Sequence, residues 1–327
     1  MSAVTQADQA APGAVPAGGL IGHRGLADRG FQWLALAAGL LVLIILLLIA
    51  VTTTEQASSW FSTEGTKIFG TVWDPSANKF GATPFLYGTA VTGIIALVMA
   101  VPVSVAIALL LTEVVPYRLA RPIVYVVDLL AVVPSVVWGL WGILVFAPWI
   151  QHIYADIASA VNGIPVLGSL FGAPTSGASF FTAGIILAFM ITPIVTSLSR
   201  EVMATVPTVD REGAYALGAT RWEMIRGVVW PHSQGGVVGA VLLGLGRAIG
   251  ETIAVALVIG SSPTITSHLF APGYNMPAVI ANQFGESTGV WKAGLMGLGV
   301  LLFVFTIIVN VIARAAVDRS ARRMRGA

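Results

Sequence analysis

The sequence predicts an all-α, polytopic membrane protein with six transmembrane helices. Hydrophobic residues make up 56% of its 327 residues, and charged residues make up only 10%. A water-soluble domain of this length cannot cover its surface with so few charges. The mean hydropathy of +0.87 and a set of long apolar runs, which do not alternate as barrel strands do, place the chain in the helical membrane class.

Six apolar runs account for the expected helices. Each is near or above the roughly 20 residues that a helix needs to cross a bilayer. The segments between them are polar or rich in Gly and Pro, and the third run is the least clearly bounded. In chain order, the expected spans are 31–51, 83–111, 122–150, 180–199, 234–260 and 291–314.

The N-terminal part is expected to be a disordered tail followed by an uncleaved anchor. Residues 1–22 are rich in Ala, Gly and Pro and carry little charge, so we expect disorder over residues 1–30. The first apolar run is longer than the roughly 7–15 apolar residues of a cleaved signal core. The chain is therefore divided into a tail at 1–30, a six-helix transmembrane domain at 31–315 and a basic tail at 316–327.

Basic residues are distributed unequally between the two sides of the membrane. Of the 17 Lys and Arg residues, thirteen lie in the termini, in the loop after the second span and in the segment after the fourth span. Three lie in the opposite loops, and Arg247 lies within a span. The positive-inside rule then places both termini and residues 200–233 in the cytoplasm.

The longest cytoplasmic connection is expected to form two short helices. Residues 211–218 are good helix formers that follow Asp210, a candidate cap. Gly218 permits a sharp turn, and a second helix at 220–229 is expected to end before the next span at Pro231. Physical reasoning leaves two readings open: docking to a soluble partner, or an amphipathic segment that rests on lipid headgroups.

The same connection resembles the EAA loop of ABC-importer permeases. That pattern is Glu-Ala-Ala, three residues, Gly, nine residues, Ile, one residue, Leu-Pro, and the spacing here matches throughout. In that family the loop is a coupling helix that sits in a groove of the ATPase subunit. The resemblance therefore implies a coupling segment at 205–231. Its matching positions are Glu212, Gly213, Ala214, Gly218, Val228, Trp230 and Pro231, of which Gly213, Val228 and Trp230 depart from the pattern.

Four further blocks resemble the PstC-type permease of phosphate-specific ABC importers. They lie at 84–113, 132–149, 193–207 and 246–260 and read PFLYGTAVTGIIALVMAVPVSVAIALLLTE, VVPSVVWGLWGILVFAPW, PIVTSLSREVMATVP and GRAIGETIAVALVIG. The Gly-Glu-Thr-Ile-Ala-Val run is closer to the PstC type than to the related PstA permease. The resemblance implies a type I-like importer permease fold.

This resemblance implies a permease subunit of an ATP-driven phosphate importer in the bacterial plasma membrane. Its implied partners are a PstA-like second permease, two copies of a PstB-like ATPase, an extracytoplasmic PstS-like phosphate-binding protein and the phosphate ion. ATP and Mg would be bound by the ATPase. The chain itself would need no cofactor and would not be an enzyme, in agreement with the lack of a P-loop pattern in its sequence.

Several other readings stay open. The permease could carry another oxyanion, such as sulfate or molybdate, or be the PstA-like partner. A transporter that works without ATP would be supported by an inverted repeat, which the sequence does not reveal. A membrane-embedded signalling component is compatible with the first reading. Nucleic acid is not an expected partner, because the net charge is only +2.

Arg247 and Glu251 are the charges inside the fifth span. They are four residues apart, so they are expected to share one face of a helix. A charge in hydrocarbon is costly, so Arg247 must face protein or a water-filled path. One reading is a structural salt bridge, and the other is an anion site, because a guanidinium suits a tetrahedral oxyanion. The resemblance implies the second, since that family's membrane Arg and Glu in this segment are implicated in phosphate passage.

Asp128 is a further acid within a span. It lies about two helical turns from the cytoplasmic end of the third run. Arg118 and Arg121 are near enough in the sequence to be its partners, so structural pairing is expected.

Overall fold

The computed structural model describes residues 26–174 and 176–325. The chain divides into two compact units, Met1–Val51 and Thr52–Ala327. Within the described residues, six helical segments are long and apolar enough to cross a membrane, which confirms the expected number. These segments are Arg29–Phe69, Thr83–Val114, Ser135–Val161, Phe180–Ala204, Arg221–Gly250 and Gly289–Ala315.

The first unit contains the N-terminal part of helix α1, which spans Leu26–Glu64. The large apolar side chains of this part are exposed in the isolated chain, as expected for a helix that is surrounded by lipid. Of the expected disordered tail, residues 1–25 lie outside the described residues. Residues 26–30 belong to α1, so the helix begins before the expected span.

The core of the second unit is the pairing of α2 (Thr83–Leu109) with α7 (Phe180–Ala204). Gly184 on α7 makes room for Ile95 of α2, because a Cβ at this position would collide with the Ile95 side chain. Polar groups also join the helices: the Ser104 hydroxyl donates to the carbonyl of Thr192 at 3.2 Å, and the Thr196 hydroxyl donates to the carbonyl of Ser104 at 3.5 Å. The small or hydroxylated buried residues of α2 recur every three or four positions, at Gly88, Thr89, Thr92, Gly93, Ala96, Ala100 and Ser104.

Gly88→Ala is expected to destabilise the protein by about 1–3 kcal/mol. A Cβ at Gly88 would collide with the carbonyl oxygen of Tyr274, which is backbone and cannot rotate away. The matched control is Gly93→Ala on the same helix, whose Cβ would meet the nearest atom, on Ile249, at 3.9 Å. Thermal unfolding in detergent measures the difference in stability between the two variants. Equal unfolding midpoints would show that α2 and the segment around Tyr274 can move apart without a cost in free energy.

The third expected span, 122–150, is wrong in its bounds. The chain instead forms α3 (Tyr117–Val132), breaks, and continues through α4 and a π-helical turn, η3, into α5. Pro134 explains the break, because a proline disfavours the helical conformation of the residue before it, and Val133 is extended with φ −60° and ψ 125°. The continuing helical elements are α4 Ser135–Trp141, η3 Gly142–Phe146 and α5 Ala147–Val161.

The fifth and sixth spans also differ from their expected bounds. Helix α10 (Trp230–Gly250) ends earlier than expected, and the short helix α11 (Ile253–Val258) follows it. Helix α13 (Gly289–Arg325) continues far beyond the expected end of the sixth span. The helix therefore includes most of the expected basic tail at 316–327, whose last two residues lie outside the described residues.

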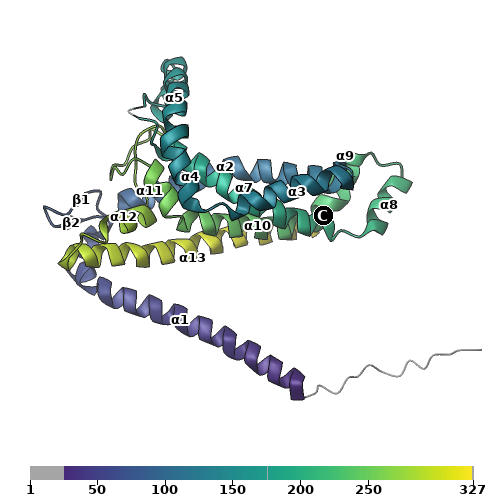
Figure 1. Cartoon of the computed structure of the whole chain (residues 1–327), viewed down its shortest axis with the longest axis horizontal. Helices are drawn as coiled ribbons and strands as arrows, with labels where there is room; N and C mark the ends of the chain where they lie inside the picture. Colours follow the sequence, from purple (N-terminus) through teal and green to yellow (C-terminus); the bar gives the residue numbers. More distant parts are fainter. Residues whose placement is uncertain (1–25, 175, 326–327) are drawn as a thin grey trace, which may run out of the picture. The chain divides into compact units, whose positions relative to one another are not determined.

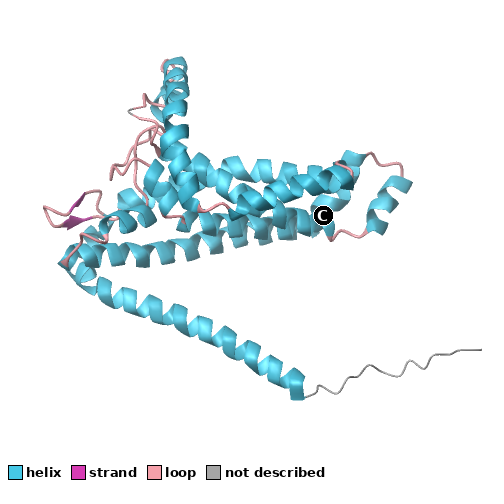
Figure 2. Cartoon of the chain, viewed as in Figure 1, coloured by secondary structure: helices cyan, strands magenta, loops and turns pink. Residues whose placement is uncertain are grey.

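The second unit has two different ends (Figure 1). Helices α8 and α9 lie at one end, and α11, α12 and a small hairpin lie at the other, with α5 projecting near them. In the part of the chain that the structure describes, this hairpin contains the only strands (Figure 2). The remaining elements are η1 Gly65–Phe69, β1 Trp73–Asp74, β2 Lys79–Phe80, η2 Leu110–Val114, α6 Pro165–Leu170, α8 Thr208–Ala216, α9 Arg221–Met224, η4 Ile225–Val229 and α12 Met276–Gln283.

Candidate functional site

A groove of about 1060 Å³ runs between α7, α10 and α13. Its walls are mostly aliphatic, and its polar side chains are Arg247, Asn310 and Arg314. We call it the α10 groove. It is lined by Ile194, Gly235, Val238, Gly239, Leu242, Leu243, Gly246, Arg247, Ile307, Asn310, Val311 and Arg314.

Glycines on one face of α10 keep the groove open. Gly235, Gly239 and Gly246 all line it, and a Cβ built on any of them would meet nothing within 4 Å. Their spacing follows the helical repeat, so they share one face. These glycines are therefore not required for close packing within this chain, and each leaves space where a longer side chain would narrow the groove.

Arg247 presents an exposed guanidinium to the α10 groove. It lies one turn before the end of α10, and within the described residues it forms no ion pair. Arg314 on α13 is a second exposed cation in the same groove, and no carboxylate lines it. The groove therefore combines an apolar wall with two positive charges, a composition that favours a small anion and disfavours a cation.

Glu251 corrects the expected geometry of the fifth span. The two charges do not share a helix face, because α10 ends at Gly250 and Glu251 is extended, with φ −70° and ψ 127°. Glu251 is buried, and its Oε1 accepts a long hydrogen bond of 3.4 Å from the amide of Ala254. Its carboxylate thus caps the first turn of α11. The structural salt bridge between Arg247 and Glu251 is absent among the described residues.

The expected coupling residues gather at the other end of the unit, on α8 and at the start of α10. Glu212 and Gly213 are exposed on α8, and Ala214 packs against a small buried cluster that includes Met203 and Val206. Gly218 ends the helix with φ +85°, a left-handed conformation that only glycine adopts without strain. Thr220 and Glu223 then form a reciprocal capping box that starts α9.

Pro231 does not end the second short helix as expected. Helices α9 and α10 are joined by the π-helical turn η4 into one uninterrupted helical run from residue 221 to residue 250. Pro231 lies in the first turn of α10. A proline has no N–H to donate to the preceding turn, and a π-helical turn is one way in which a helix accommodates such a defect.

The expected coupling segment, residues 205–231, also presents large exposed apolar side chains. Val209 is 73% exposed, Leu217 is 91% exposed and Trp222 is 66% exposed. They come from the start of α8, the turn after it and the start of α9. Exposed large apolar groups that cluster on one segment mark an interaction surface.

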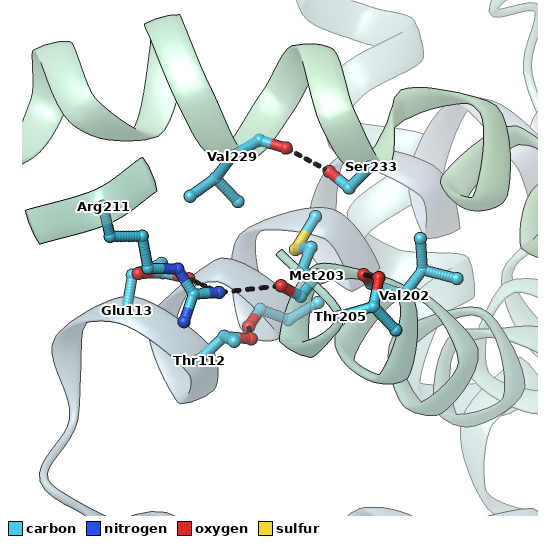
Figure 3. Close-up of polar contacts among 9 residues, drawn as sticks. Thr112, Glu113, Val202, Met203, Thr205, Arg211, Val229 and Ser233 are labelled. Carbon is cyan, nitrogen blue, oxygen red and sulfur yellow. Dashed lines mark hydrogen bonds and ion pairs between the residues drawn. The ribbon is translucent and has the colours of Figure 1, made fainter. Parts of the chain in front are cut away.

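One ion pair connects the coupling segment to the transmembrane core (Figure 3). The Nη2 atom of Arg211 on α8 lies 3.0 Å from Oε1 of Glu113 in η2, and the same atom donates a 2.8 Å hydrogen bond to the carbonyl of Met203 on α7. The side chains are 20% and 5% exposed. Arg211 therefore links α8 to the ends of both core helices, α2 and α7.

Glu113→Gln is expected to destabilise the protein by about 2–4 kcal/mol, because it leaves Arg211 as an uncompensated, largely buried charge. Arg211→Gln should have a comparable effect through Glu113. The double variant should recover at least half of the summed loss, since it leaves neither charge unpaired. Thermal unfolding in detergent checks the cycle, and strictly additive losses would mean that the two charges do not interact.

Sequence reasoning missed four residues that the structure brings into these sites. Asn310 and Arg314 line the α10 groove from a helix that was read only as the sixth span and the basic tail after it. A polar Asn one turn before an Arg in an apolar span was the available signal. Glu113 and Arg211 are almost one hundred residues apart in the chain, and no local pattern predicts their contact.

Comparison with known proteins identifies close relatives. The family model described as "Binding-protein-dependent transport system inner membrane component" matches residues 83–326. A Xylella fastidiosa (strain Temecula1) protein named "Phosphate transport system permease protein PstC" is 44% identical over 257 residues, which are 78% of this chain and 79% of that protein. A Haemophilus influenzae protein of the same name is 43% identical over 265 residues, or 80% and 84% of the two chains.

Solved structures of importers share the fold. A bacterial alginate ABC transporter, solved with a periplasmic protein that holds an alginate pentasaccharide, matches with a TM-score of 0.59 at 15% identity. The match covers 91% of this chain and 98% of that chain. A second structure of an alginate-importing ABC transporter matches with a TM-score of 0.54 at 16% identity, over 90% and 98% of the two chains. The ABC importer permease fold is thereby confirmed.

Proposed function

The chain belongs to the family of binding-protein-dependent transport system inner membrane components, and from this premise we propose that it is the permease subunit of an ATP-driven phosphate importer. The observation that carries the proposal is the position of Arg247 in the α10 groove of a chain whose relatives are named phosphate permeases. These names favour the PstC type over the PstA-like partner.

The groove provides the chemistry that a phosphate path needs. A guanidinium offers planar N–H donors that match two oxygens of a tetrahedral anion. No carboxylate pairs with Arg247 in the described part of the chain, so its donors are available to the ion. Asn310 adds a neutral donor and acceptor, and Arg314 lies about one turn along α13 from it. Neither group encloses the ion, which favours release as well as binding.

A second permease completes the path in this proposal. The α10 groove is open along one side, and apolar side chains beside it, such as Leu243, Ile307 and Val311, are exposed in the single chain. A related permease, PstA-like by the resemblance, would cover this face. The ion would then pass between the two subunits, with Arg247 contributed by this chain.

Two ATPase subunits would supply the energy, one of them docking on the coupling segment at 205–231. Val209, Leu217 and Trp222 supply the apolar contact and Glu212 supplies an exposed charge. ATP and Mg would be bound by the ATPase, so the chain itself performs transport and no catalysis. An extracytoplasmic phosphate-binding protein would deliver the ion at the opposite end, where α5, α12 and the small hairpin lie. Both termini then lie in the cytoplasm, as the positive-inside rule requires.

The helical run from α9 to α10 suits the conversion of ATPase closure into movement at the groove. At about 1.5 Å per residue, the 26 steps from Arg221 to Arg247 span roughly 40 Å without a break. Displacement of α8 and α9 therefore moves the groove wall directly. The contacts of Arg211 with Glu113 and Met203 carry the same displacement to α2 and α7. Alternating access follows when this movement opens and closes the two ends of the path.

Uptake in proteoliposomes tests the substrate. The assembled transporter is expected to take up labelled phosphate when ATP is supplied to the ATPase side, and excess sulfate or molybdate should leave the rate unchanged. Competition by either anion would assign the path to that oxyanion instead. Uptake without ATP would contradict the coupling to an ATPase and favour a secondary transporter.

A further inference from the structure

We propose that a second pocket, at the end of the molecule that carries α8, is a binding site for a phosphate group. The pocket has a volume of about 480 Å³ and lies between η2, α3, α7 and α8. None of its residues lines the α10 groove, so it is a separate site. It is lined by Leu111, Thr112, Tyr117, Ala120, Arg121, Val124, Tyr125, Arg200, Ala204 and Arg211.

Three arginines from three different helices line this pocket. Arg121 comes from α3, Arg200 from the last turns of α7, and Arg211 from α8. Arginines on separate elements repel one another unless a negative charge joins them. Their gathering around one cavity is therefore an arrangement that an anion would stabilise.

The carboxylates nearby neutralise only one of these three charges. Glu113 pairs with Arg211, and among the described residues neither Arg121 nor Arg200 forms an ion pair. Asp128 was expected to pair with Arg118 or Arg121. This expectation is wrong, because neither arginine forms an ion pair among the described residues. Glu201 and Asp210, each next to a pocket arginine in the sequence, are exposed and form no ion pair with any residue that the structure describes.

Arg211 also keeps unused donor capacity. Its Nη2 atom makes both recorded contacts, to Glu113 and to the Met203 carbonyl, while its buried Nε has no hydrogen-bond partner among the described residues. A buried N–H group without a partner is uncommon and calls for an acceptor. Because Nε itself is buried, a phosphate oxygen in the pocket would reach Arg211 through Nη1, for which the described residues record no hydrogen bond.

The rest of the pocket wall has two characters. Tyr117 and Tyr125 are exposed and carry hydroxyl donors. The Cζ atom of Arg121 lies 6.0 Å from the centre of the Tyr125 ring. Leu111, Ala120 and Val124 provide an apolar floor. Oxyanion donors above an apolar floor suit a phosphate group, either on an anionic phospholipid of the inner leaflet or as free phosphate. The cytoplasmic placement of this end rests on the positive-inside rule.

Lipid retention by the purified full-length chain is the first test. In native mass spectrometry, wild type should bind phosphatidylglycerol at least tenfold more tightly than phosphatidylcholine. Arg121→Gln and Arg200→Gln should each lower the phosphatidylglycerol affinity at least fivefold. Arg118→Gln is the matched control, because Arg118 is an exposed arginine on the same helix as Arg121 and does not line the pocket.

Free phosphate is the second arm. The chain with both Arg247→Ala and Arg314→Ala, in phosphatidylcholine nanodiscs, lacks the two arginines of the α10 groove, so any phosphate-dependent rise in its unfolding temperature reports other sites. If Arg121→Gln or Arg200→Gln abolishes a rise in the unfolding temperature at millimolar phosphate, the pocket binds the free ion. If these variants weaken binding in the lipid measurement only, the pocket binds the lipid headgroup.

If neither Arg121→Gln nor Arg200→Gln changes the phosphatidylglycerol affinity or the phosphate-dependent unfolding temperature, the proposal is wrong. Size-exclusion profiles establish which variants are folded. If Arg200→Gln is not monodisperse, Arg200→Lys keeps the charge and loses the planar donor pair, and should weaken binding less than Arg121→Gln does.

Discussion

Arg247→Ala is expected to lower phosphate uptake by about 10- to 100-fold while the transporter still assembles. The magnitude corresponds to the loss of one or two charged hydrogen bonds to the ion, roughly 1.5–3 kcal/mol. Assembly should survive because the guanidinium is exposed in the α10 groove and forms no ion pair within the described chain. Phosphate-stimulated ATP hydrolysis should fall with uptake, whereas basal hydrolysis should remain.

Two variants sharpen this measurement. Arg247→Lys keeps the charge and loses the planar donor pair, so its uptake should lie between wild type and Arg247→Ala. Arg118→Ala is the control, because Arg118 is an exposed arginine on α3 that lies outside both the groove and residues 205–231. Wild-type uptake by Arg247→Ala at equal assembly would remove this residue from the phosphate path.

Gly218→Val is expected to reduce ATPase binding at least tenfold and to abolish ATP-driven uptake. The residue has φ +85°, and a branched side chain in this conformation costs roughly 1–2 kcal/mol or forces the turn to rearrange. Either outcome changes the position of Leu217 relative to α9. Co-purification of the ATPase subunit with the tagged chain gives the readout.

Gly213→Ala provides a control within the same segment. Both glycines are exposed, and a Cβ at either would meet nothing within 4 Å, so steric collision does not separate the two variants. Gly213 lies inside α8 and lacks the positive φ, so alanine should stabilise that helix by up to roughly 1 kcal/mol. ATPase binding should be retained or improved, and a loss equal to that of Gly218→Val would show that the segment tolerates no added side chain.

The sequence was sufficient for features that depend on composition and on local spacing. The number of spans follows from apolar runs, because hydrocarbon thickness sets a minimum helix length. The turn at Gly218 follows from a glycine placed after a stretch of good helix formers. The coupling role of the segment around Glu212 stays a prediction. Arg247 was recognisable because a charge in an apolar span is costly wherever it lies.

The features that were missed depend on contacts between distant segments or on local breaks. Glu251 was read as the helical neighbour of Arg247 because hydropathy runs through the break without a change. The contact of Arg211 with Glu113 requires α8 to pack on η2. Arg314 belongs to the groove only because α13 continues beside α10. None of these arrangements leaves a periodic signal in the sequence.

The π-helical turn η4 affects the direction in which residues 205–231 face relative to Arg247. A π turn holds one more residue than the α-helical turn it replaces, so residues 225–229 contain one position that a regular helix would not need. The wide turn absorbs the extra residue, so the residues on its two sides keep nearly the angular relation that they would have across a regular turn with one residue fewer. A further inserted residue would have no such turn to absorb it and would rotate everything before it by about 100° relative to α10. The angle between residues 205–231 and Arg247 thus depends on the length of this run, which should tolerate substitutions far better than a further insertion.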